Sequence, residues 1–132
     1  MAALSAYSEK LVLDWLLGGA AATQQTTRAI GLSLGAPSSI SGSEIGTTLG
    51  YTRQTAGFSA ASSPAGTTLN ATAITYGTFN ASTVVSGVQI WDTVLQSNSG
   101  NMLWYGVLAT PRTVLSGDYL VLAVGALTCS LT

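Results

Sequence analysis

Charged residues are scarce in this chain, and histidine is absent. Only 9 of the 132 residues are charged, four Lys or Arg and five Asp or Glu. This is 7% of the chain, against about 25% in a typical soluble domain. General acid–base catalysis and metal binding both need titratable side chains held close together. We therefore expect a protein that is not an enzyme, with no catalytic residues, no metal site and no cofactor.

The basic residues are too few to bind nucleic acid. Lys10, Arg28, Arg53 and Arg112 are widely separated in the sequence, so they predict no basic surface that could follow a phosphate backbone. The net charge is −1. Because a net charge near zero provides little repulsion between copies, the composition favours a protein that associates with itself.

Further cysteines and long apolar runs are also missing. Cys129 is the only cysteine, so no disulfide can form within the chain, and its apolar neighbours predict a buried, unreactive thiol. The uncharged stretch over residues 54–91 is interrupted throughout by Ser, Thr, Asn and Gly, unlike the roughly 20 apolar residues of a membrane-spanning helix. We expect no membrane segment, and the lack of a basic leader argues against a cleaved signal peptide.

The residues that are present supply ample material for a core. Hydrophobic residues make up 47% of the chain, Ser and Thr together number 34, and Gly numbers 15. A chain of this length is typical of one domain. We therefore expect residues 1–132 to form a single domain whose surface is solvated by hydroxyls and backbone rather than by charges.

The first predicted element is an amphipathic α-helix over about residues 5–17. Tyr7, Leu11 and Trp15 recur at the spacing of one helix face, which is the helical signature. Ser5 is a suitable N-cap, and Gly18 is a suitable left-handed stop. Further leucines widen the apolar face, so we expect the helix to lie across a sheet or in a subunit interface.

After residue 19 the pattern changes to short β-strands rich in β-branched residues. The predicted strands cover residues 26–34, 51–60, 69–76, 84–91, 102–109, 119–124 and 126–131. A loop is predicted at 37–46, and the segment 110–118 contains Pro111 and the turn pair Gly117-Asp118. If the strand at 26–34 faces a core, Arg28 must lie at its end. Short strands separated by turn signals are typical of an antiparallel β-sandwich or jelly roll.

Two of the acids, Asp92 and Asp118, raise the alternative of a carboxylate pair. Glycoside hydrolysis needs two carboxylates about 5–10 Å apart. Asp118 follows Gly117, and Asp92 follows Trp91 at a strand end, and both positions are typical of turns. We favour the turn interpretation.

The remaining candidate residues are aromatic or basic. Trp104 and Tyr105 must point to opposite faces of a strand, so one of them would face the core and the other a neighbouring subunit. Arginine forms bidentate pairs with carboxylates and is suited to interfaces. We hypothesise that at least one arginine pairs across a subunit contact with Glu44, Asp92 or Asp118.

Three segments, by their sequence, order and spacing, resemble segments of a known protein family. They are residues 4–18, residues 50–61, and residues 100–106 followed by Pro111, Val114, Gly117-Asp118 and Gly125-Ala126-Leu127. With them the chain resembles small virion proteins of tailed bacteriophages, which are described as tail-fibre-like, head-fibre or capsid decoration (cement) proteins. The resemblance implies a β-sandwich virion protein that forms a homotrimer and has no enzymatic activity.

Within this family we favour a capsid decoration protein on the outer surface of the head. Its partners would be itself, as a homotrimer, and the major capsid protein, whose neighbouring subunits it would clamp. The alternative is a tail-fibre or adhesin module that binds a host-surface glycan. We expect loops 37–46 and 95–99 to contact neighbours. The predicted interface residues are Tyr7, Leu11, Trp15, Arg53, Trp104, Tyr105 and Arg112.

Overall fold

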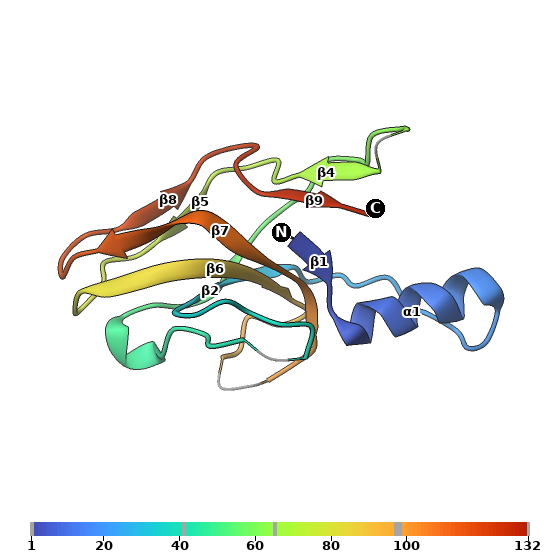
Figure 1. Cartoon of the computed structure of the whole chain (residues 1–132), viewed down its shortest axis with the longest axis horizontal. Helices are drawn as coiled ribbons and strands as arrows, with labels where there is room; N and C mark the ends of the chain where they lie inside the picture. Colours follow the sequence, from blue (N-terminus) through green and yellow to red (C-terminus); the bar gives the residue numbers. More distant parts are fainter. Residues whose placement is uncertain (1, 41, 65, 97–98, 132) are drawn as a thin grey trace.

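The computed structural model describes residues 2–40, 42–64, 66–96 and 99–131, and antiparallel strands dominate it. The larger sheet has the order β1-β7-β6-β2-β3, with bounds β1 (Ala2–Leu4), β7 (Met102–Val114), β6 (Thr83–Trp91), β2 (Ala29–Ser33) and β3 (Gln54–Thr55). Two smaller sheets pair β4 (Thr67–Leu69) with β9 (Thr128–Ser130) and β5 (Ile74–Tyr76) with β8 (Leu120–Leu122). A 3-10 turn, η1, covers Thr47–Leu49. The two small sheets form a second layer over the larger one (Figure 1), which confirms the expected mostly-β, sandwich-like fold.

The core lies between these two layers. Ile30 and Leu32 of β2 are fully buried in one cluster with the rings of Tyr51, Tyr76 and Phe79. The rings of Tyr51 and Tyr76 stack with their centroids 5.7 Å apart. Tyr76 Oη donates to the Ile30 carbonyl (3.2 Å), and Tyr51 Oη accepts from the Leu32 amide (2.8 Å). Because buried phenols need such partners, these two bonds tie both rings to the backbone of β2.

Among the described residues one α-helix occurs, α1 (Ala6–Leu17). Ser5 Oγ accepts a hydrogen bond from the Ser8 amide (3.2 Å) and so caps the first turn. The helix ends at Gly18, whose φ of 70° is a conformation that glycine adopts without steric cost. The predicted cap and stop are therefore confirmed. The helix does not lie across a sheet, because it extends beyond the end of both layers (Figure 1).

The strand predicted over residues 26–34 is shorter than expected. Only Ala29–Ser33 pairs, as β2, and all five of its residues are buried. Arg28 lies just outside the strand, as predicted, and its Nη1 donates to the Gln25 carbonyl (2.9 Å). A strand buried on both faces has no place for a charge, so the cation is confined to its end.

The strand predicted to end at residue 109 is longer than expected, because β7 continues through Pro111 to Val114. The pairing of β7 with β6 jumps from Val107 to Arg112, which leaves residues 108–111 bulged out of the ladder. Proline has no amide to donate, and a bulge requires no ladder bond from it. The bulge therefore allows a proline inside a long strand.

Asn70 divides the strand predicted over residues 69–76 into β4 and β5. Its side chain is buried. Its Nδ2 donates to the carbonyls of Thr72 (2.9 Å) and Ala123 (2.8 Å), and its Oδ1 accepts from the Leu127 amide (2.8 Å). Because the side chain satisfies these backbone groups, the chain changes its pairing partner there from β9 to β8. The strand predicted over residues 51–60 is likewise reduced to β3.

Candidate assembly interface

Apolar side chains occupy most of the surface of the second half of α1, yet the described residues leave four of them largely uncovered. The only buried residue of the helix is Ser8. The exposed large residues are Leu13 (56%), Trp15 (70%), Leu16 (63%) and Leu17 (79%), and we call these four the helix tip. A helix whose apolar side chains cover most of its surface is normally buried. The helix tip is therefore the first candidate for an interface with another molecule.

The start of α1, in contrast, is tied to the sheet and to a loop. The Ser5 amide donates to the Leu103 carbonyl (3.1 Å), and the Ala6 amide donates to the Ser39 carbonyl (3.0 Å). Ser5 Oγ also donates to the carbonyl of Met102. These bonds fix the direction of the helix, so the helix tip is held out from the body of the protein at a defined place.

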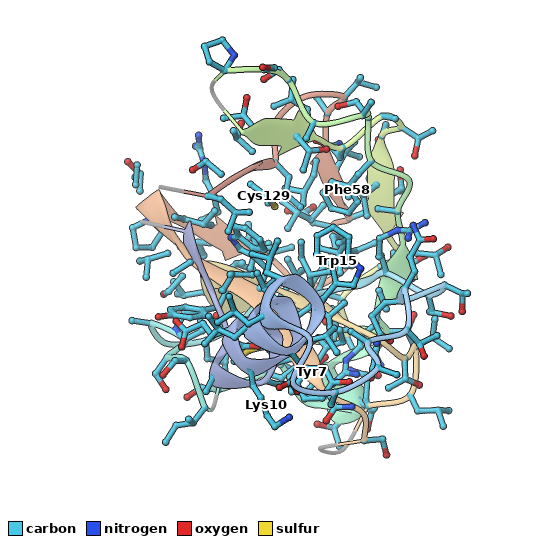
Figure 2. All side chains as sticks on the ribbon, turned by 90° about the vertical axis from the view of Figure 1, so that its right-hand side faces the viewer. Tyr7, Lys10, Trp15, Phe58 and Cys129 are labelled. Carbon is cyan, nitrogen blue, oxygen red and sulfur yellow. The ribbon has the colours of Figure 1, made fainter. Side chains whose placement is uncertain are left out.

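The polar strip of α1 is narrow. Lys10 and Asp14 form an ion pair one turn apart, and the carboxylate of Glu9 is exposed. Figure 2 looks along the helix and shows Lys10 and Trp15 on opposite sides of it. On the Trp15 side a groove of about 430 Å³ separates the helix from residues 22–24. Lys10 and Asp14 thus occupy one strip, Glu9 lies on a neighbouring face, and the rest of the helix surface is largely apolar.

Three predicted interface residues lie on this helix. Tyr7 is 36% exposed and Trp15 is 70% exposed, whereas Leu11 is partly buried. All three are on the element that protrudes. Their contact with another subunit stays a prediction.

Trp104 and Tyr105 point to opposite faces of β7, as predicted for neighbours on a strand. Trp104 packs against the main core, and Tyr105 packs against a second, smaller cluster that contains Trp91 and Met102. Both rings are partly buried. The contact of Tyr105 with a neighbouring subunit stays a prediction.

Arg53 lies inside the protein, so its predicted place at a subunit contact needs correction. Its side chain is 0% exposed, and that of its partner Glu44 is 12% exposed. The guanidinium binds both carboxylate oxygens, with Nε–Oε1 and Nη2–Oε2 distances of 2.7 Å each. Glu44 was among the predicted partners of an arginine, but this pair forms within one chain.

The same guanidinium joins further parts of the chain. Its Nη1 donates to the carbonyls of Thr93 (3.0 Å) and Ser99 (3.2 Å), and its Cζ lies 4.0 Å from the centroid of the Trp91 ring. Loops 37–46 and 95–99, which we expected to contact neighbours, are thus held by one cation. Residues 41 and 97–98 of these loops lie outside the described part of the chain.

Arg112 is exposed and lines a groove that was not predicted from the sequence. This groove, about 660 Å³ in volume, opens between the bulge of β7 and the strand β8, and we call it the β7–β8 groove. Its main lining residues are Val85, Leu108, Arg112, Leu120, Val121 and Leu122. The signal in the sequence was the apolar run at 120–122. Because polar and apolar residues do not alternate there, the run indicates a strand with neither face fully exposed to solvent.

Asp92 and Asp118 serve as turn residues, which confirms the turn interpretation. Asp92 accepts from the amide (2.7 Å) and from Nδ2 (2.8 Å) of Asn101. Asp118 Oδ2 accepts from the Leu115 amide (3.4 Å). Within the described ranges, no three His, Cys, Asp or Glu side chains gather as metal ligands would. No helix among the described residues has the length and apolar character needed to cross a bilayer.

Cys129 is buried in the main core, as predicted. Burial raises the pKa of its thiol from the ordinary value of 9.0 to about 11. The reactive thiolate is therefore rare near neutral pH.

The family of the chain follows from a comparison over nearly its whole length. Residues 3–130 match the family described as Podophage GP4 fiber I protein gp80. The chain belongs to this family. It is accordingly a structural component of a bacteriophage particle, as the resemblance implied. A search of curated proteins found no match.

Proposed function

We propose that this protein is a fibre subunit of a podophage particle that works by binding other copies of itself, as a homotrimer, and has no catalytic role. The observation that carries the proposal is the helix tip, whose four large apolar side chains are more exposed than buried. Covering each such side chain contributes roughly 1.5–3 kcal/mol. No neighbour within the described chain covers them.

The scarcity of charge supports the same function. A buried charge costs several kcal/mol unless it is paired, so a surface of hydroxyls and apolar groups is easier to bury than a charged one. The one buried arginine of the chain, Arg53, already has Glu44 as a partner. An assembly contact can therefore form without burying an unpaired charge.

The description of the family favours a fibre subunit over the capsid decoration protein that the sequence analysis placed first. A decoration protein would clamp major capsid subunits over the whole head, whereas a fibre subunit would be confined to the projecting fibres of the particle. Antibody labelling of intact particles separates the two roles. Label confined to projecting fibres supports the proposal, and label spread evenly over the head would replace it with the decoration role.

Self-association is tested directly by light scattering on the purified protein. We expect a trimer at micromolar concentration, and we expect the double variant Leu16→Ser, Leu17→Ser to be a folded monomer. The matched control is Leu131→Ser, which removes another exposed leucine (55%) far from α1 in the sequence. A wild-type monomer, or equal loss of assembly in both variants, would contradict the proposal.

A further inference from the structure

Two unfilled apolar surfaces lie at opposite ends of this molecule. Figure 1 shows α1 at one end of the long axis and β8 toward the other. The helix tip is a convex apolar surface, and the β7–β8 groove is a concave one. Because α1 lies at the end opposite to the β7–β8 groove of its own chain, it cannot fill that groove. Only the α1 helix of a second copy could do so.

The groove is open because of the local structure of β7. The bulge at residues 108–111 carries that part of β7 away from β6, and β8 pairs on one side only, with β5. Leu108, Leu120 and Leu122 therefore reach the core but stay only partly buried. Val121 remains 45% exposed at the rim. The described chain has no side chain left to fill this space.

The two surfaces also carry opposite charges. Glu9, Leu13 and Leu16 share one face of α1, since they follow the i, i+4, i+7 spacing. Glu9 and Arg112 are both exposed, and the structure gives neither side chain an ion-pair partner among the described residues. A face with leucines and a carboxylate thus complements a groove with leucines and a guanidinium, in the manner of helix-in-groove recognition.

We propose that α1 of one copy docks by its Glu9–Leu13–Leu16 face in the β7–β8 groove of the next copy, with Glu9 pairing with Arg112. The contact is head to tail, so each copy uses two different surfaces, and three copies close into a ring if the rotation permits. A stable interface covers about 800 Å² per partner. A 12-residue helix offers little of that in one contact, but in a closed ring each copy makes two such contacts, one through α1 and one through its groove. This inference rests on the proposed self-association and names its geometry.

Charge reversal tests the pairing without touching the core. Glu9→Arg alone and Arg112→Glu alone should each weaken association about tenfold or more, because each places like charges together. The double variant Glu9→Arg, Arg112→Glu should recover wild-type association to within about threefold. Lys10→Glu is the control, because it reverses a neighbouring charge of α1 that already pairs with Asp14 and lies outside the Glu9–Leu13–Leu16 face. It should change association less than the other single variants. A double variant no better than either single one would overturn the pairing.

Cross-linking identifies the two surfaces that meet. Protein with Leu16→Cys and protein with Val121→Cys are mixed and oxidised, and the buried Cys129 gives little background. We expect a disulfide between the two variants. A Leu16→Cys product formed only with itself would overturn the proposal in favour of a bundle of α1 helices, and would leave the proposed self-association standing. A wild-type protein that stays monomeric would instead remove both.

Discussion

Arg53 shows how a single residue can organise a chain that has few charges. One guanidinium binds a carboxylate through two bonds, two backbone carbonyls and one aromatic face. Its planar fork of donors suits this arrangement, which the ammonium of a lysine cannot reproduce. The cation therefore acts as the fixed point between β6 and two loops.

We expect Arg53→Met to lower the free energy of unfolding by about 3–5 kcal/mol, because it leaves the largely buried Glu44 carboxylate unpaired. Lys10→Met, which breaks the exposed pair with Asp14, should cost less than about 1 kcal/mol. Urea denaturation of both variants measures the difference. Similar midpoints would mean that the buried pair contributes no more than the exposed one.

The two stacked tyrosines predict a loss of stability at alkaline pH. Burial, together with the nearby charge of Glu44, raises the pKa of Tyr51 and of Tyr76 far above the ordinary value of 10.0. Above about pH 10 the unfolded chain therefore loses these protons while the folded chain keeps them. The free energy of unfolding therefore falls as the pH rises above about 10, by about 1.4 kcal/mol per pH unit for each tyrosine.

Urea denaturation between pH 8 and pH 11.5 measures this slope. Tyr76→Phe should reduce it by the share of one tyrosine, whereas Tyr119→Phe, which removes the hydroxyl of an exposed ring (67%), should leave it nearly unchanged. The prediction fails if the two variants show the same slope as the wild type.

At the scale of elements, polar side chains and bulges decide where strands start and end. Asn70 ends one strand and begins another because its amide bonds with three backbone groups. Pro111 fits within β7 because a bulge removes the need for its amide. Apolar alternation alone cannot show either event, since both depend on residues distant in the sequence.

We expect Asn70→Ala to destabilise the fold by about 3 kcal/mol or more, because it leaves buried backbone groups without hydrogen-bond partners, and each such group costs roughly 1–3 kcal/mol. Asn80→Ala is the matched control, since the side chain of Asn80 is exposed, and it should change stability by less than about 0.5 kcal/mol. Thermal melting followed by circular dichroism checks both. An equal shift in the two variants would show that Asn70 has no such role.

At the scale of the whole molecule, stability and assembly are linked. A partner that binds only the folded chain raises the melting temperature as its concentration rises. We expect the melting temperature of the wild type to increase between 1 and 100 µM protein, whereas that of the variant Leu16→Ser, Leu17→Ser stays constant. Scanning calorimetry at several concentrations measures this, and a wild-type temperature independent of concentration would exclude assembly of the folded chain.

Much of this protein could be predicted from its sequence, because the signals are local. Ser5 and Gly18 mark the ends of α1 by their own backbone chemistry, and the alternation of β6 marks a strand. The burial of Cys129 follows from its apolar neighbours. Each of these signals lies within a few residues of the element that it predicts.

Only the tertiary structure decided which of these elements meet. It placed Arg53 in the interior because Glu44, Trp91 and two loop carbonyls come together around it, and it left the helix tip uncovered because α1 extends past both layers. It also created the β7–β8 groove from a bulge and a free strand edge. Long-range pairing sets these features, and no short stretch of sequence carries the free energy of contacts made across the whole chain.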